Sequence, residues 1–78
     1  MANRSNYEKN RKNLENNIIR LMRNKNMTAR ALSMRIEKNE RYITRMLNGK
    51  IDPSLDTLFQ IAMALRVEPA ELFIKKEN

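Results

Sequence analysis

The chain has 78 residues and a net charge of +7, which suits one small basic domain. It contains no Cys and no His, so disulfide bonds and thiolate metal sites are excluded, and the commonest general bases and nucleophiles of enzymes are absent. No apolar run approaches the ~18 residues of a membrane span, and the N-terminus lacks the hydrophobic region of a signal peptide, so we expect a cytoplasmic protein.

The charge is unevenly placed along the chain. Segments 1–13, 14–27 and 28–50 carry +3, +2 and +4, whereas segment 51–78 carries −2. This layout is typical of a protein with one face that meets phosphate and another that does not. Composition alone is equally compatible with a basic protein that is merely soluble.

Residues 1–13 are rich in Asn, Lys and Arg and contain few apolar residues. We therefore predict a disordered basic arm, which either is a solvated tail or lies along DNA as basic arms do in some regulators. From residue 14 the apolar residues recur at helical spacing, which predicts a first helix over residues 14–25. Its inward stripe consists of Leu14, Ile18, Leu21 and Met22.

The middle of the chain has the pattern of two short helices joined by a tight turn. Thr28 is a good N-cap for the first of them, and Asn39 is a good N-cap for the second, which we predict over residues 39–47. Ser33 is small enough for a close helix crossing, and Ile43 is placed to wedge between the two helices.

This helix pair resembles the helix-turn-helix of the XRE family, the regulators that include the lambda repressor and Cro. The family's small residue, turn residue and branched aliphatic residue stand at Ser33, Glu37 and Ile43. The loop Asn48-Gly49-Lys50 resembles the loop after the family's recognition helix. Further likeness in two later helices extends the resemblance over residues 14–74.

The resemblance implies an all-α fold. It is the five-helix, lambda-repressor-like DNA-binding domain, with helices 2 and 3 as the helix-turn-helix. We expect this domain over residues 14–75, followed by a tail over residues 76–78.

Some positions depart from the family's pattern. Ala29 stands where a Gln usually contacts phosphate, so only a backbone anchor is expected there. Glu37 stands where Gly is usual because the family's backbone is left-handed there. The turn is therefore expected either to keep a positive φ at a cost of about 1 kcal/mol or to have a different shape, with both helices present in either case. Met22 and Leu47 stand where many members bury an Arg against a Glu. Replacing both partners by apolar groups is often neutral or stabilising, so we predict that these two side chains touch in the core.

Two further helices are predicted in the last third of the chain. Ser54 caps a fourth helix that ends near residue 66, and Pro69 is a favourable first residue for a fifth. Two large apolar residues widen the apolar sector of the fourth helix beyond what one packing partner covers, and a third lies in an apolar run of the fifth helix. They form either ordinary core between these two helices or a dimer seam: Phe59, Met63 and Phe73.

The resemblance also implies that the N-terminal half of the helix at 39–47 enters the major groove of DNA. The expected base-reading residues are Asn39, Glu40, Arg41, Thr44 and Arg45. The expected phosphate-binding residues are Thr28, Ala29, Arg30, Asn48 and Lys50. Glu40 repels phosphate, so it either reads a base, orients Arg41, or stabilises the helix dipole as the first helical residue.

We therefore expect a sequence-specific regulator of transcription that binds double-stranded DNA. Repression as a homodimer on a pseudo-palindromic operator is the expected mode, without enzymatic activity, cofactor, metal, membrane or small-molecule ligand. The alternative is a protein-interaction module with the same fold, such as an antitoxin or a regulatory partner subunit. Salt-dependent binding to duplex DNA discriminates between the two.

Overall fold

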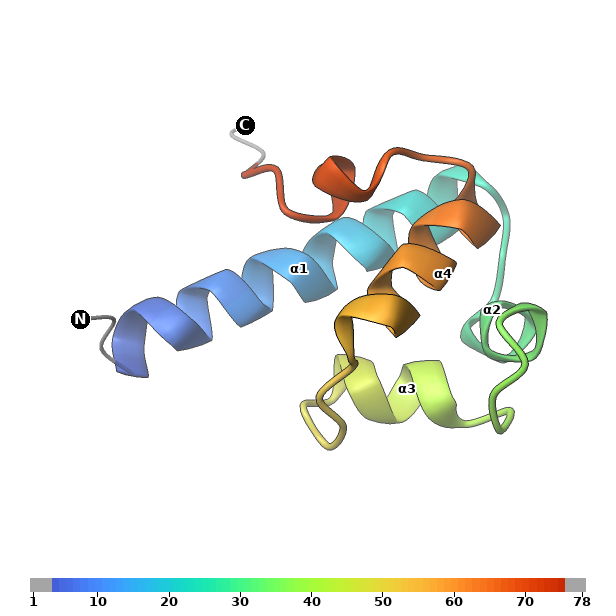
Figure 1. Ribbon diagram of the computed structural model, residues 1–78, viewed down its shortest axis with the longest axis horizontal. Coiled ribbons are helices and arrows are strands. Elements are labelled where there is room, and N and C mark those ends of the chain that lie inside the picture. The colour runs from blue at the N-terminus through green and yellow to red at the C-terminus, as the bar shows by residue number, and fades with distance from the viewer. Residues whose placement is uncertain (1–3, 76–78) are drawn as a thin grey trace.

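The computed structural model describes residues 4–75 and shows a helical molecule (Figure 1). Its elements are α1 (Arg4–Asn24), α2 (Ala29–Arg35), α3 (Tyr42–Leu47), α4 (Leu55–Leu65) and η1 (Pro69–Leu72). No strand occurs in this described part of the chain, so the all-α prediction is confirmed. The expected tail at 76–78 lies outside the described residues.

The predicted fifth α-helix is one turn of 3₁₀ helix, so four α-helices are present in residues 4–75. The N–H of Glu71 donates to the carbonyl of Glu68 at 2.9 Å, and the N–H of Phe73 donates to the carbonyl of Ala70 at 3.0 Å. These three-residue hydrogen bonds are the 3₁₀ pattern. With four residues, η1 makes only this one turn, and the chain after it continues along α1.

Helix α1 begins at Arg4, ten residues earlier than predicted, so the disorder expected for residues 1–13 is wrong from residue 4 onward. Residues 1–3 lie outside the described part. Figure 1 shows the N-terminal half of α1 projecting past the other helices. Arg11 lies one turn before Leu14 and continues the inward stripe of this helix at spacing i, i+3, i+7 to Ile18. Its side chain contacts the segment after α3, which explains why the helix persists there.

The core lies between α1 and the layer formed by the other helices. Helix α2 packs against α3 and α4, and η1 packs against α1 and α4. Met22 is buried and Leu47 packs half-buried against the same core, while their direct contact stays a prediction. The buried apolar residues are Leu14, Ile18, Leu21, Met22, Leu32, Ile36, Ile43, Met46, Ile61, Ala62, Leu65 and Leu72.

Asparagines of α1 hold the C-terminal segment against that helix. The amide of the buried Asn17 donates to the carbonyls of Leu72 at 2.9 Å and Ile74 at 2.7 Å. Asn13 donates to the carbonyl of Phe73 at 3.1 Å. Because buried backbone carbonyls need partners, these amides let the irregular chain end lie against the core.

Each α-helix of the described chain is followed, one or two residues after its last residue, by a left-handed residue. These residues are Asn26 (φ 54°), Glu37 (φ 60°), Gly49 (φ 76°) and Arg66 (φ 61°). In each case the next N–H donates back across five residues, as from Lys38 to Ser33 at 2.9 Å, which closes the helix end. Of the two outcomes expected at Glu37, the structure has the positive φ, and the non-Gly residues each cost about 1 kcal/mol.

Candidate functional site

The hydroxyl group of Ser33 fixes α2 and α3 against each other. It donates to the carbonyl of Ala29 at 2.7 Å and accepts the N–H of Ile43 at 2.9 Å. Both Ser33 and Ile43 are fully buried. The side chain is therefore more than a small residue at a crossing, because it satisfies one of the free N–H groups at the start of α3.

Helix α3 starts later than predicted. Its first residue is Tyr42 and its N-cap is Arg41, so the helix expected over 39–47 spans Tyr42–Leu47. Asn39 begins a separate turn, in which its side chain accepts the N–H of Arg41 at 2.8 Å and its carbonyl accepts the N–H of Tyr42 at 2.9 Å. The side chain of Asn39 favours a local turn over a longer helix, which is a known tendency of this residue type.

All five expected base-reading residues are exposed: Asn39, Glu40, Arg41, Thr44 and Arg45. Two of them, Thr44 and Arg45, lie on the solvent side of α3, opposite Ile43 and Met46, which are fully buried. The others lie in the turn that precedes the helix. Within residues 4–75 the guanidinium groups of Arg41 and Arg45 make no hydrogen bond or ion pair, so both can donate to a ligand.

Glu40 forms an ion pair with Arg30 of α2, with Oε1 3.5 Å from Nε. Glu40 lies two residues before the first residue of α3, so a helix-dipole role as first helical residue is wrong. Both side chains are more than half exposed, and such pairs contribute little to stability. The pair links one expected base-reading residue to one expected phosphate-binding residue.

The expected phosphate-binding residues form two separate groups. At the start of α2 the hydroxyl of Thr28 accepts the N–H of Ala31 at 3.0 Å, so this cap is made as predicted. Arg30 is exposed and Ala29 is half-buried. After α3, Asn48 and Lys50 are exposed in the loop that Gly49 turns.

Arg11 was not among the predicted site residues, although it contacts this loop. Its Nη2 donates to the carbonyls of Met46 at 2.9 Å and Ile51 at 2.6 Å. The sequence held one signal for it, because Arg11 is a charged residue on the inward stripe of α1 at three residues before Leu14. A cation at such a position is costly unless it has partners.

Phe59, Met63 and Phe73 are 45%, 77% and 51% exposed. These fractions exclude the alternative in which they form core between α4 and η1. Leu55, one turn before Phe59, is 63% exposed and was not predicted to belong to this set. Leu55, Phe59 and Met63 follow one another at i, i+4 and i+8, which places them on one face of α4.

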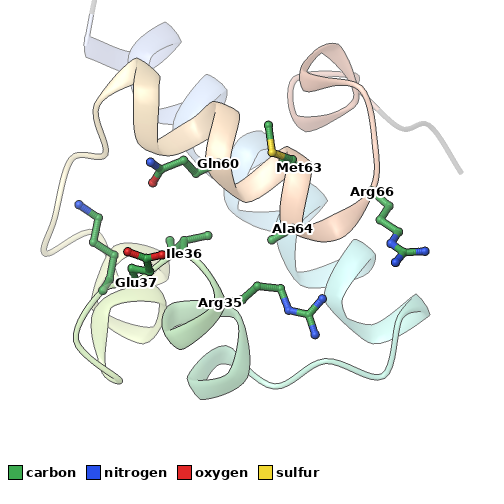
Figure 2. Close-up of a pocket in the computed structure, with 8 residues that line it drawn as sticks. Arg35, Ile36, Glu37, Gln60, Met63, Ala64 and Arg66 are labelled. Atoms are coloured by element: carbon green, nitrogen blue, oxygen red, sulfur yellow. The ribbon is translucent and has the colours of Figure 1, made fainter.

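A cleft of about 640 Å³ separates the end of α2 from α4, as Figure 2 shows. Arg35 and Glu37 reach it from the side of α2, while Gln60 and Met63 line the side of α4. None of the expected DNA-contacting residues lines this cleft. The candidate interface is therefore the solvent face of α3 with the residues at its two ends.

Among the helices of residues 4–75, none combines the length and the apolar character needed to cross a bilayer. The same part of the chain contains no group of three or more His, Cys, Asp or Glu side chains arranged for a metal ion.

Comparison with known proteins gives one match. A protein-family model described as "Helix-turn-helix" matches residues 18–72, which is more than half of the chain. The matched range runs from the middle of α1 to the end of η1 and includes α2 and α3. No curated protein and no solved structure matches the chain.

Proposed function

Because this chain belongs to the XRE family of lambda repressor/Cro-like helix-turn-helix DNA-binding regulators, we propose that it is a sequence-specific repressor that reads the major groove with α3. The single observation that carries this proposal is the polar face of α3 and its preceding turn. Arg41 and Arg45 are exposed there and have unpaired guanidinium groups, while the opposite side of the helix is anchored by Ile43 and Met46. A rigid helix with free arginines suits bidentate bonds to guanine.

Residues in the loop after α3 and at the start of α2 support a phosphate role. Lys50 and Asn48 lie after the helix, and Arg30 lies at the start of α2. Segment 28–50 carries a charge of +4, which favours binding to a polyanion at low salt. Ala29 offers no polar side chain, so contact at the start of α2 is limited to backbone N–H groups, the hydroxyl of Thr28 and Arg30.

The test compares base reading with phosphate binding. Duplexes selected from a random pool supply the best operator, and binding is measured by fluorescence anisotropy across a salt series. Arg41→Ala should cost about 1–3 kcal/mol on this operator and much less on random duplex, relaxing one base position. Lys50→Ala should weaken both duplexes alike and lower the salt slope by about one per subunit.

Arg35→Ala is the matched control, because it removes one exposed arginine from the cleft behind α2 and leaves the α3 face intact. Equal effects of Arg41→Ala and Lys50→Ala on both duplexes would contradict base reading by α3. Absence of salt-dependent duplex binding would instead favour the protein-interaction module.

The exposed apolar side chains support a homodimer on a pseudo-palindromic operator. Phe59 and Met63 lie with Leu55 on one face of α4, and Phe73 is also about half exposed. Exposed apolar side chains that are grouped in this way mark interaction surfaces, whereas isolated ones are ordinary. Phe59→Glu and Phe73→Glu should weaken self-association, as measured by sedimentation velocity with and without operator. A monomer under both conditions would contradict the dimer.

A further inference from the structure

The guanidinium group of Arg11 joins the N-terminal half of α1 to the segment that follows α3. Its Nη2 donates to the carbonyls of Met46 at 2.9 Å and Ile51 at 2.6 Å, and its Nη1 donates to Asp52 at 2.6 Å. The side chain of Arg11 is only 14% exposed.

The two carbonyls lie at the base of the loop that carries Asn48, Gly49 and Lys50. Met46 is the second-last residue of α3, so its carbonyl lacks an α-helical partner and also accepts the N–H of Gly49 at 3.0 Å. One nitrogen bonded to both Met46 and Ile51 holds the two ends of the loop together. A cation at this position is also stabilised by the negative end of the dipole of α3.

The charge of Arg11 is balanced where it lies. Glu15, whose side chain is 8% exposed, places Oε2 3.2 Å from Nε, and Asp52 supplies a second carboxylate. Burial alone would lower the pKa of Arg11, but the hydrogen bond to Asp52 and the neighbouring charges outweigh it and raise the pKa. The guanidinium therefore keeps its charge and can donate to the loop carbonyls in the folded protein.

We propose that Arg11 is a positioning residue for DNA binding, which holds the loop of Asn48 and Lys50 in the conformation that presents these side chains to phosphate. The proposal rests on the proposed function, because it explains what holds Asn48 and Lys50 in place for the phosphate contact proposed there. Both terminal nitrogens of Arg11 are bonded to Asp52 and to the loop carbonyls, and its buried Nε has no hydrogen-bond partner and only an ion-pair contact with Glu15. Because the guanidinium group is nearly buried, Arg11 acts on the nucleic acid through the loop.

The first readout needs no DNA. Amide hydrogen exchange of Gly49 and Lys50 should accelerate about tenfold or more in Arg11→Met, because the base of the loop loses its bonds to a charged donor. Amides of α4 report the global stability, and the loop effect is taken relative to them. Arg11→Lys keeps the charge but replaces the two terminal nitrogens of the guanidinium fork by a single ammonium nitrogen, which does not reproduce the separate positions of Nη1 and Nη2. This variant should therefore also accelerate exchange, even if Arg11→Met folds poorly.

Lys9→Met is the matched control. It removes the same charge from the same helix, and Lys9 lies about 200° around α1 from Arg11 at 100° per residue. Its side chain is exposed. Exchange at Gly49 and Lys50 should be unchanged in this variant.

The second readout is a double-mutant cycle on duplex DNA. In the unmodified chain Lys50→Ala should lower the salt slope by about one per subunit, and it should do so equally in the Lys9→Met background. In the Arg11→Met background the same change should lower the slope by less than half as much, because the loop no longer presents Lys50.

Three results would overturn the proposal. Unchanged loop exchange in both Arg11 variants would show that the bonds do not hold the loop. Equal losses of duplex affinity in Arg11→Met and Lys9→Met would show that the loss comes from the removed positive charge and not from the loop. If loop exchange is faster in the Arg11 variants but the unmodified chain binds no duplex, the two proposals are distinguished. Arg11 would then hold the loop, whereas DNA binding by α3, and with it the role of Arg11 in DNA binding, would be wrong.

Discussion

The two ends of α3 are anchored by different parts of the molecule. At the N-terminal end the hydroxyl of Ser33 accepts the N–H of Ile43 at 2.9 Å, across ten residues of sequence. At the C-terminal end the guanidinium of Arg11 donates to the carbonyl of Met46 at the same distance of 2.9 Å, across 35 residues. One anchor belongs to the helix pair, and the other comes from α1.

The two anchors therefore have different roles. One fixes the orientation of α3, and the other fixes how the loop after α3 presents its side chains. The Ser33 anchor sets α3 against α2 and lies in the fully buried interior. The Arg11 anchor sets the loop after α3 and depends on how α1 extends beyond the core. The helix pair alone therefore contains the information that orients α3, whereas its following loop requires the N-terminal half of α1.

The largest expected effect concerns the C-terminal end of α3. Leu47→Glu should lower the free energy of unfolding by about 3 kcal/mol, because a charge would replace an apolar side chain packed against the core. Urea unfolding measures the change. Adding Met22→Arg should recover part of the loss if the two side chains touch, and a double variant no more stable than Leu47→Glu would contradict that contact.

The N-terminal end is tested by Ser33→Ala, which should cost about 2 kcal/mol. The N–H of Ile43 would lose its acceptor in a fully buried site, and an unsatisfied buried donor is costly. Ser5→Ala, on the exposed surface of α1, should change the free energy of unfolding by less than about 0.5 kcal/mol. Similar values for the two variants would show that the buried hydroxyl is not an anchor.

The smallest effects concern the left-handed residues that flank α3. Glu37→Gly should raise the melting temperature or leave it unchanged, because relief of about 1 kcal/mol of strain at φ 60° is opposed by the greater freedom of Gly in the unfolded chain. Gly49→Ala should lower it, although no atom lies within 4 Å of the added Cβ, because φ 76° itself is unfavourable. A clear loss in Glu37→Gly would mean that the turn needs the Glu37 side chain.

The parts of the structure that follow from local pattern were predictable. The inward stripe of α1 and the cap at Thr28 each depend on residues within one or two helical turns. The positive φ at Glu37 was one of two outcomes that the family resemblance implied, and the structure has it. The close crossing at Ser33 followed from residue size, although its hydrogen bond to Ile43 did not, because the direction of a hydroxyl depends on the finished packing.

The parts that escaped prediction depend on contacts far apart in the sequence. The early start of α1 is explained by Arg11, whose partners lie 35 to 41 residues away. Asn39 was expected to start the helix, and it forms a separate turn instead, because its side chain accepts the N–H of Arg41 two residues on. The ion pair of Glu40 with Arg30 likewise requires the relative placement of two elements, which spacing along the chain does not give.

The buried amide of Asn17 has a consequence for the order of assembly. Its two acceptors, in Leu72 and Ile74, lie 55 and 57 residues further along the chain. Closing so large a loop carries an entropic cost that is repaid only after the intervening helices have packed. Before the C-terminal segment docks, the amide of Asn17 can bond to water, but covering this face of α1 with a segment that lacks the two carbonyls would leave the amide buried without a partner. This one side chain therefore couples α1 to the chain end after η1. A domain that packs its helices without docking this end lacks the two hydrogen bonds and is less stable than the complete fold.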